Sequence, residues 1–298
     1  MSYAVIIPSY NRPEMLKRSL ASVFAQTMLP SKIHLVIDEP EDGEKYAFLG
    51  DYSHVLDVTF SGGGCGGAKA RNLGLDRVKD VDYVFFLDDD DEWLPEKSEK
   101  QIALLERRPA AVGVTCACYR CSGDARSLVS RDEKQINRYV KLWNFTGGFS
   151  CFGFRWNEAT KGLRLRGELM SAQDFEFYMR IALEGVIVSV SEPLILFYAH
   201  DGPRISGNRL KKKQSYERIL QMNRNIFGFE DVMFNRAKME LMTAPFLSSI
   251  WAGFFTYIKG TLLLLAAFCL PSISWHLWSS STRHFISRFR GTLKLEGE

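Results

Sequence analysis

The sequence has almost no net charge. Its 38 Lys and Arg residues stand against 35 Asp and Glu, which leaves a formal charge of +3 over 298 residues. A protein whose main task is to bind nucleic acid carries a larger basic excess, so we expect no nucleic-acid partner. Disorder as the general state is also excluded, because 46% of the residues are hydrophobic and only 24% are charged.

Secretory and disulfide signatures are missing as well. Residues 1–8 lack the basic region and apolar stretch of a secretory signal, and the six cysteines follow no regular disulfide spacing. Both absences favour a cytosolic, thiol-reducing setting. Cys116, Cys118 and Cys121 lie close enough together to suggest zinc. No fourth ligand is near and they follow the apolar run 110–114, so we favour a buried strand over a metal site.

Short apolar runs alternate with helical patterns in the first half of the chain. The runs are rich in β-branched and aromatic residues without polar alternation, as in strands buried on both faces of a parallel sheet: residues 4–7, 33–37 and 83–87. Apolar residues recur at helical spacing in the segments between and after them: residues 12–26, 68–78 and 95–107. The alternation predicts an α/β domain with helices flanking a mostly parallel central sheet.

A polar cluster follows each of these three runs. The clusters are Ser9-Tyr10-Asn11, Asp38-Glu39 and the four aspartates 88–91. Ligands bind at the carboxyl ends of the strands in open α/β sheets. We therefore expect the three clusters to meet at one sheet edge and to form the active site.

Four consecutive aspartates would repel one another unless a cation neutralises them. Hard divalent ions prefer carboxylate oxygens, and Mg²⁺ or Mn²⁺ completes its shell with substrate phosphate and water. In an extended segment, alternate side chains share a face. This alternation would pair Asp88 with Asp90 and Asp89 with Asp91.

Four sequence blocks resemble those of family 2 glycosyltransferases with the GT-A fold. They are residues 6–13 (IIPSYNRP), 70–74 (ARNLG), 86–97 (FLDDDDEWLPEK) and 172–180 (AQDFEFYMR). The blocks occur in the family's order and cover roughly residues 3–210. The chain is most similar to the members that assemble bacterial surface polysaccharides such as O-antigen and capsule.

The resemblance implies a role for several residues in holding the donor. Pro8, Ser9 and Tyr10 would line the nucleotide base pocket, with Asp38 accepting a hydrogen bond from the base and Arg71 beside it. The full set expected to bind the nucleotide sugar is Pro8, Ser9, Tyr10, Asp38, Arg71, Asp88, Asp89 and Arg204.

The resemblance also implies the catalytic and metal-binding residues. Asp90 would be the principal ligand of Mn²⁺ or Mg²⁺, Asp88 would meet the metal or the ribose, and His200 would join them over the diphosphate. A loop histidine with no such role is the alternative for His200. Asp174 would be the general base that takes the proton from the acceptor hydroxyl.

We expect two domains. A GT-A domain would span 1–215, with its nucleotide-sugar part over about 1–110 and its acceptor part over about 111–215. A helical, apolar tail would span 216–298, because Lys259 is the only charged residue between positions 244 and 275. A membrane-seated helix or hairpin is favoured for this tail, while a single tilted span and a core or dimer helix pair stay open. The basic run 204–224 lies before the apolar segment that begins at residue 244. It would bind anionic lipid or a diphosphate, or it would form a solvated helix face.

The implied activity is an inverting, metal-dependent transfer of a sugar from a nucleotide-diphosphate donor, UDP being the commonest carrier. The acceptor would be a lipid-diphosphate-linked saccharide at the cytoplasmic face of the inner membrane. A nucleotidyltransferase is the first alternative, but the glycine-rich run 61–67 does not follow the first strand and has no Walker pattern. The second is a membrane-bound nucleotide-sugar-binding protein without catalysis, which the presence of Asp88, Asp90 and Asp174 disfavours.

Overall fold

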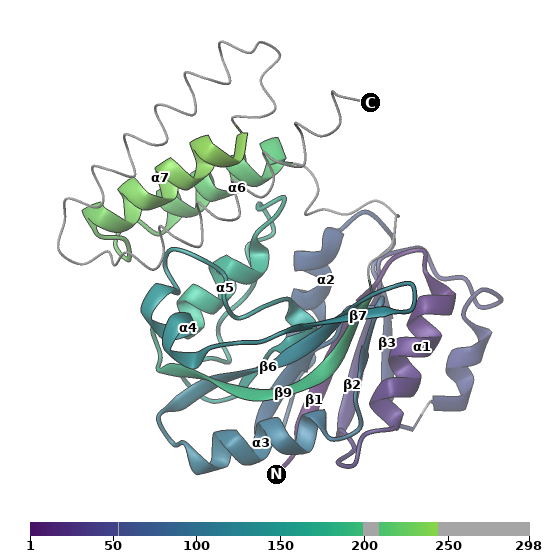
Figure 1. The fold of residues 1–298 in the computed structure, drawn as a ribbon. Coiled ribbons are helices and arrows are strands. Elements are labelled where there is room, and N and C mark those ends of the chain that lie inside the picture. Colours follow the sequence, from purple (N-terminus) through teal and green to yellow (C-terminus); the bar gives the residue numbers. More distant parts are fainter. Residues whose placement is uncertain (53, 199–208, 244–298) are drawn as a thin grey trace, which may run out of the picture. The chain divides into compact units, whose positions relative to one another are not determined.

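Strands of one sheet form the centre of the first of two units (Figure 1). The computed structural model describes residues 1–52, 54–198 and 209–243. Four neighbouring strands pair in parallel in the order β3-β2-β1-β4. They are β1 (Tyr3–Ser9), β2 (Lys32–Ile37), β3 (Leu56–Phe60) and β4 (Tyr83–Phe86). This half of the sheet has the parallel arrangement that the apolar runs predict.

The other half of the sheet is mixed. The order continues β4-β8-β6-β9-β5, with antiparallel pairs on both sides of one parallel pair, β6 with β9, while β7 forms a hairpin with β6. The strands are β5 (Asp91–Trp93), β6 (Ala111–Ser122), β7 (Ala125–Val129), β8 (Gly153–Arg155) and β9 (Val186–Tyr198). Cys116, Cys118 and Cys121 are buried free thiols on β6, as expected for a core strand.

Helices cover both faces of the sheet, so β1 is buried on each side. Tyr3, Val5 and Ile7 pack on the face covered by α1 and α3, whereas Ala4 and Ile6 pack on the face of α2, α4 and α5. The helices are α1 (Pro13–Phe24), α2 (Gly66–Leu75), α3 (Lys97–Arg107), α4 (Glu133–Tyr139) and α5 (Gln173–Ile181). Two 3₁₀ turns, η1 (Ala47–Tyr52) and η2 (Phe149–Cys151), complete the unit.

Glycine brings α2 unusually close to the sheet. A Cβ at Gly74 would lie 2.6 Å from Cγ2 of Ile6, so only hydrogen fits between this helix and β1. The preceding glycine-rich loop adopts positive φ at Gly62, Gly63 and Gly64. The loop and the first turn of α2 lie beside the carboxyl end of β2, because the amides of Cys65 and Gly66 donate to the Asp38 carboxylate.

The chain divides into units 1–207 and 208–298. In the second unit, α6 (Arg209–Met222) packs against α7 (Phe229–Thr243), and Lys213 pairs with Glu240 at 3.4 Å. The domain boundary expected at residue 215 falls inside α6. No helix of the described residues is long and apolar enough to cross a membrane. The apolar segment 244–275 lies outside the described residues.

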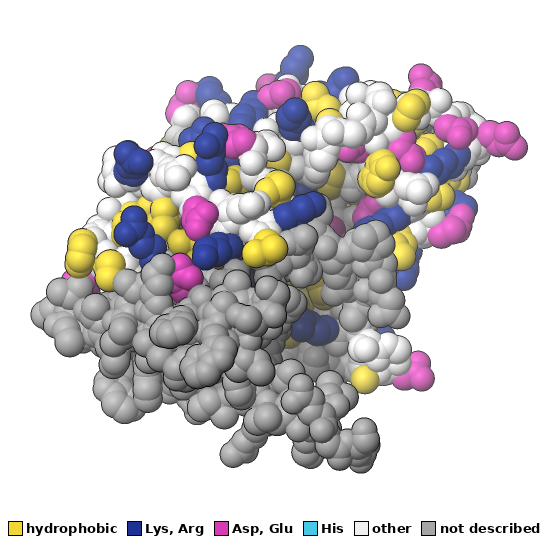
Figure 2. Space-filling model, turned by 90° about the horizontal axis from the view of Figure 1, so that it is seen from above, with side chains coloured by type: hydrophobic (Ala, Val, Ile, Leu, Met, Phe, Trp, Pro, Cys, Tyr) yellow, Lys and Arg dark blue, Asp and Glu magenta, His cyan; other side chains and the backbone are white. Residues whose placement is uncertain are grey.

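The described surface reflects the near-neutral composition. Figure 2 shows basic, acidic and apolar side chains interspersed on one face. No large field of one sign is visible among the coloured side chains of that view.

Candidate active site

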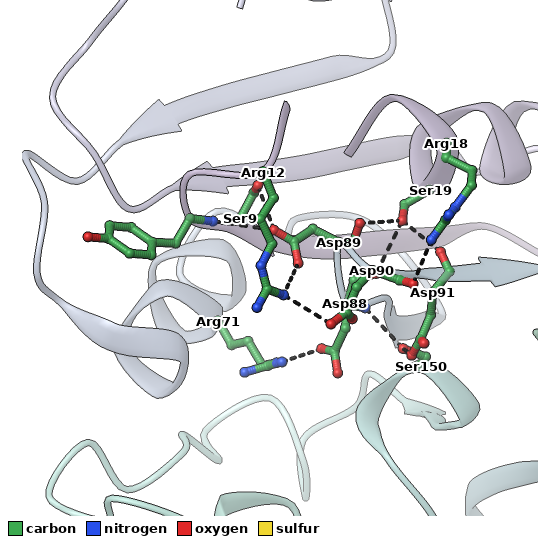
Figure 3. Close-up of polar contacts among 11 residues, drawn as sticks. Ser9, Arg12, Arg18, Ser19, Arg71, Asp88, Asp89, Asp90, Asp91 and Ser150 are labelled. Carbon is green, nitrogen blue, oxygen red and sulfur yellow. Dashed lines mark hydrogen bonds and ion pairs between the residues drawn. The ribbon is translucent and has the colours of Figure 1, made fainter. Parts of the chain in front are cut away.

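The acidic loop, defined here as Asp88–Asp91, connects β4 to β5 at the carboxyl end of the parallel strands. Its chain reverses in a turn, with the Asp91 amide donating to the Asp88 carbonyl at 3.2 Å. Ser19 of α1 supports the turn, because its Oγ lies 2.6 Å from the Asp91 carbonyl and 2.9 Å from the Asp89 carbonyl. Figure 3 shows Arg12, Arg71, Ser19 and Ser150 around this loop. The loop is therefore held by several segments that are distant in sequence.

Asp89 is tied to the end of β1. Its Oδ2 accepts from the Ser9 hydroxyl at 2.8 Å and from the Tyr10 amide at 3.3 Å, and Arg12 Nη1 lies 3.4 Å from Oδ1. Burial raises the pKa of Asp89 to about 6, although the Ser9 hydrogen bond lowers it in part. Asp89 thus links the acidic loop to the Ser9-Tyr10-Asn11 turn.

The other three aspartates form a cluster. Carboxylate oxygens of Asp88, Asp90 and Asp91 lie within 4.8 Å of one another. The expected pairing of Asp89 with Asp91 is wrong, since the turn interrupts the two-residue alternation of an extended segment and returns Asp91 to the side of Asp88 and Asp90.

The chemistry of this cluster fits a hard divalent cation. Burial raises the pKa of Asp88 and of Asp91, and the neighbouring Asp90 carboxylate raises both further. Asp91 is 1% exposed. Its Oδ2 accepts from the Ser150 hydroxyl at 2.5 Å, whereas its Oδ1 has no hydrogen-bond partner. Crowded carboxylates with an unpartnered oxygen are the donor set that Mg²⁺ or Mn²⁺ prefers.

Two arginines neutralise part of this charge. Arg71 of α2 donates to Asp88 Oδ1 through Nη2 and to the Gly67 carbonyl at 3.1 Å through Nη1. Its guanidinium lies 4.2 Å above the Phe149 ring, which holds it in one orientation. Arg12 donates to Asp90 Oδ2 at 3.0 Å. Arg71 thus lies beside the acidic loop, and its predicted role in binding the nucleotide stays a prediction.

Asp38 follows β2 and holds the glycine-rich loop. Its Oδ1 accepts from the Ser61 hydroxyl at 2.6 Å and the Cys65 amide at 2.8 Å, and its Oδ2 accepts from the Gly66 amide at 2.7 Å. Burial raises the pKa of Asp38, but these three hydrogen bonds outweigh it and hold the pKa below the ordinary value. Asp38 is 6% exposed, so it has a structural task besides any contact with a base.

The three residues expected in the base pocket differ in exposure. Ser9 is buried, Pro8 is half-buried, and the Tyr10 ring is 62% exposed at the carboxyl end of β1. Asn11 then adopts a positive φ of 54°, which turns the chain into α1. An aromatic ring exposed at this edge is available to stack on a planar ligand.

Asp174 is the second residue of α5. Its Oδ2 accepts from Asn144 Nδ2 at 2.7 Å and its Oδ1 accepts from the Phe175 amide at 2.8 Å. Tyr178 lies one turn later and is buried. Its pKa is raised well above the ordinary value by burial first, and then by the charges of Asp174 and Asp88. Asn144, which holds the expected base, lies on the same short segment as Ser150, which donates to Asp91 of the acidic loop.

Several supporting residues were not among the site residues expected from the sequence: Arg12, Ser19, Asn144 and Ser150. Arg12 lies within the first sequence block, and its membership of that block is the signal that could have identified it. Ser19, Asn144 and Ser150 carry no distinguishing pattern in the sequence. His200 and Arg204 lie outside the described residues.

The comparison with protein families decides the class of the chain. The model described as glycosyl transferase family 2 matches residues 4–162. The chain belongs to this family. The expected family is thereby confirmed, and the match includes the first three sequence blocks but not the fourth, residues 172–180. The family places the chain among the glycosyltransferases. Residues 4–162 include the acidic loop, Arg71 and Asn144 but end before Asp174.

Curated relatives extend the likeness. The amylovoran biosynthesis glycosyltransferase AmsB of Erwinia amylovora is 34% identical over 213 residues, which cover 66% of this chain and 70% of AmsB. An uncharacterized glycosyltransferase of Haemophilus influenzae is 27% identical, over 64% of this chain and 66% of its own. The UDP-Glc:alpha-D-GlcNAc-diphosphoundecaprenol beta-1,3-glucosyltransferase WfgD of Escherichia coli is 28% identical over 34% of this chain and 40% of WfgD.

Solved structures share the fold. TarS of Staphylococcus aureus in complex with UDP-GlcNAc superposes with a TM-score of 0.60 at 19% identity, covering 86% of this chain and 73% of TarS. The mannosyltransferase PcManGT of Pyrobaculum calidifontis, in complex with GDP-Man and Mn²⁺, gives 0.58 at 16% identity, covering 95% and 80%. The expected α/β fold of the GT-A type is confirmed.

Proposed function

We propose that this family 2 glycosyltransferase is an inverting, metal-dependent enzyme of cell-surface polysaccharide biosynthesis. It moves a sugar from a nucleotide-diphosphate donor, a UDP-sugar, to a hydroxyl of a lipid-diphosphate-linked saccharide. The observation that carries this proposal is the cluster of Asp88, Asp90 and Asp91 carboxylates at the carboxyl end of the parallel strands, to which the segment 144–150 links Asp174 through the hydrogen bonds of Asn144 and Ser150. The named activity of WfgD and the named pathway of AmsB support the acceptor class, and UDP-GlcNAc bound to TarS supports the donor.

The acidic cluster is the proposed metal site. Asp90 and Asp88 are its principal ligands, and His200 is a further candidate. Asp91 belongs to the same cluster of carboxylates. A bound Mn²⁺ or Mg²⁺ would supply positive charge for the leaving diphosphate. The complex of PcManGT with Mn²⁺ supports this choice of ion.

The donor is proposed to lie along the carboxyl ends of β1, β2 and β4. Pro8, Ser9 and the exposed Tyr10 ring bind the base, while Asp38 fixes the glycine-rich loop that borders it. Arg71 and Asp88 hold the ribose side of the donor. The remaining residues of the proposed donor site are Asp89 and Arg204.

Asp174 is the proposed general base. An acceptor hydroxyl becomes a strong nucleophile only as its proton is removed, so the base must lie within hydrogen-bond reach of that hydroxyl. The hydroxyl oxygen attacks the anomeric carbon as the bond to the diphosphate breaks, and the proton passes to Asp174. Displacement in line inverts the anomeric centre, so an α-linked donor gives a β-linked product.

The second unit is the proposed attachment to the membrane. We keep the division into a GT-A domain over 1–215, with a donor part to about 110, and a membrane-associated tail over 216–298. The basic side chains of α6, the helix that leads into this tail, suit an anionic surface: Lys211, Lys212 and Arg218. The proposed location is the cytoplasmic face of the inner membrane, where lipid-linked acceptors are available.

Product formation by the whole chain in a membrane-containing lysate tests the proposal. A panel of nucleotide sugars is combined with a lipid-diphosphate GlcNAc or GalNAc acceptor, with Mn²⁺ present or chelated. We expect transfer from a UDP-sugar that needs the metal, collapses in Asp174→Asn and survives in Asp132→Asn, which changes only an exposed helix cap. Nucleotide binding without transfer from any donor would overturn the proposal in favour of a binding protein. Failure to bind any nucleotide would overturn the donor site itself.

A further inference from the structure

Asn144 makes four hydrogen bonds that leave its amide only one orientation. Its Oδ1 accepts from the backbone amides of Thr146 at 3.0 Å and Gly147 at 3.1 Å. Its Nδ2 donates to the Gly147 carbonyl at 3.0 Å and to Asp174 Oδ2 at 2.7 Å. Since two N–H donors face the oxygen and two oxygens face the nitrogen, a flipped amide would lose all four bonds.

The turn that carries Asn144 is itself fixed to the sheet. The Thr146 carbonyl accepts from the hydroxyl of Thr115, a fully buried residue of β6, at 2.6 Å. Gly147 has a φ of 102°, and a Cβ there would lie 2.8 Å from Nε of Arg131. The turn therefore tolerates little displacement, and Asn144 presents its N–H from a rigid base.

The same segment reaches both sides of the proposed site. Three residues beyond Gly147, the Ser150 hydroxyl donates to Asp91 and accepts from the Asp88 amide at 3.0 Å. Residues 144–150 thus contact the proposed base at one end and the acidic loop at the other. The distance between base and metal-binding carboxylates depends on this stretch of chain.

Asp174 is held at both of its oxygens. Asn144 donates to Oδ2 and the Phe175 amide donates to Oδ1, so these two bonds set the plane of the carboxylate. A carboxamide does not take up a proton at neutral pH. Asn144 therefore contributes orientation and not proton transfer.

We propose that Asn144 is a positioning residue that aims the Asp174 carboxylate at the acceptor hydroxyl. This inference rests on the proposed function, because it concerns the base of that reaction. It adds a residue that gives the base its direction and ties that direction to the acidic loop through Ser150.

Two substitutions separate positioning from a merely structural role. Asn144→Ala removes all four hydrogen bonds. Asn144→Asp keeps the oxygen that accepts from Thr146 and Gly147. It replaces the NH₂ group that donates to Asp174 with a second carboxylate oxygen, which cannot donate. A structural role predicts that Asn144→Asp is the milder change, since the turn survives. Positioning predicts that it is at least as damaging to transfer as Asn144→Ala.

The readout is steady-state transfer combined with nucleotide binding. We expect kcat to fall about 10²-fold in both variants, the loss that a displacement of about 1 Å in a catalytic group produces. KM for the nucleotide sugar and Kd for UDP should stay within about threefold, because the donor contacts are unchanged. Unchanged UDP binding shows that the site is intact, whereas thermal unfolding of Asn144→Asp should fall somewhat, because a carboxylate oxygen then faces the Gly147 carbonyl and Asp174.

Asn137→Ala is the matched control. Asn137 of α4 also makes three backbone hydrogen bonds, to the Glu133 carbonyl and to both backbone groups of Ile187, but it does not contact Asp174. We expect it to lower the unfolding temperature without a selective loss of kcat. A kcat loss in Asn137→Ala equal to that in Asn144→Ala would overturn the positioning role.

Asp174→Asn distinguishes the two proposals. If wild type is active, Asp174→Asn is inactive and Asn144→Asp keeps kcat, positioning fails while the proposed function stands. If Asp174→Asn keeps wild-type kcat, both the base and its positioning residue are wrong. Loss of kcat in both Asn144 variants, together with inactive Asp174→Asn, supports the inference.

Discussion

Asp38→Asn tests whether Asp38 holds the glycine-rich loop. The aspartate accepts three hydrogen bonds, from Ser61, Cys65 and Gly66. Asparagine keeps one acceptor oxygen, but its NH₂ group replaces the second carboxylate oxygen and faces an N–H or O–H donor instead of accepting from it. The substitution also removes the negative charge from all three hydrogen bonds. The substitution is nearly isosteric, so any effect comes from these hydrogen bonds.

The expected loss follows from the number and type of these bonds. A hydrogen bond to a charged group contributes about 1.5–3 kcal/mol, and a buried donor left without an acceptor costs about 1–3 kcal/mol. Since one acceptor remains, we expect Asp38→Asn to lower the free energy of unfolding by about 3 kcal/mol. In a unit of this size each kcal/mol shifts Tm by about 2–4 °C, which predicts a decrease of about 6–12 °C.

The pH dependence of this loss has a definite sign. The folded protein holds the pKa of Asp38 below its ordinary value, so the stabilisation is fully present above about pH 4 and is lost as pH falls through the folded-state pKa. Thermal unfolding of wild type and variant should therefore differ fully at pH 7 and converge below pH 4. Asp132→Asn is the control and should change stability by less than about 0.5 kcal/mol, because asparagine caps a helix as well as aspartate.

Two results would refute this reasoning. One is a variant as stable as wild type at pH 7. The other is a stability difference that persists unchanged as the pH falls through the lowered folded-state pKa of Asp38, where its charge is lost. A large increase in Kd for the nucleotide with no loss of stability would instead assign Asp38 to the base pocket alone.

Three further changes test the core and the metal site. Lys97 is fully buried with its Nζ 3.8 Å from the Trp93 ring, and burial lowers its pKa from 10.5 to about 8. The unfolded chain binds more protons than the folded chain between about pH 8 and pH 10.5, so the buried charge costs most below about pH 8. Lys97→Met should therefore raise the free energy of unfolding at pH 7 by about 1–3 kcal/mol, and the gain should shrink toward pH 10. A Cβ at Gly153 would lie 2.2 Å from the buried Phe85 ring, so Gly153→Ala should cost about 1–3 kcal/mol in denaturant unfolding, whereas Gly148→Ala, with no atom within 4 Å, should be near neutral. Mn²⁺ should raise the Tm of wild type and not that of Asp90→Asn.

Much of the parallel half of the sheet was predictable because its signals are local. Strands buried on both faces appear as unbroken apolar runs, and β1, β2 and β4 match residues 4–7, 33–37 and 83–87 within two residues at each end. The mixed half was not predictable in this way. Its pairs join strands far apart in the chain, such as β5 with β9, and β8 is only three residues long.

The acidic loop shows how a correct residue type can carry a wrong geometry. The aspartates were identified because four adjacent carboxylates are costly without a cation. Their side-chain directions followed from assuming an extended chain, but the turn closed by the Asp91 amide places Asp91 with Asp88 and Asp90. The turn depends on Ser19, which lies 69 positions before Asp88, and on Ser150, which lies 62 positions after it.

Charged groups identify a site in the sequence, whereas neutral groups orient it in the fold. Asn144 and Ser150 are ordinary residue types with no informative spacing, yet one hydrogen-bonds to Asp174 and the other to Asp91. Both lie on the short stretch 144–150, so a displacement of that stretch would move the two carboxylates in a correlated way. An experiment that substitutes only the aspartates would therefore assign to them an effect that includes the alignment provided by residues 144–150. Pairing Asn144→Asp with Asp174→Asn in a double-mutant cycle separates the two contributions, and a coupling energy near zero would show that they act independently.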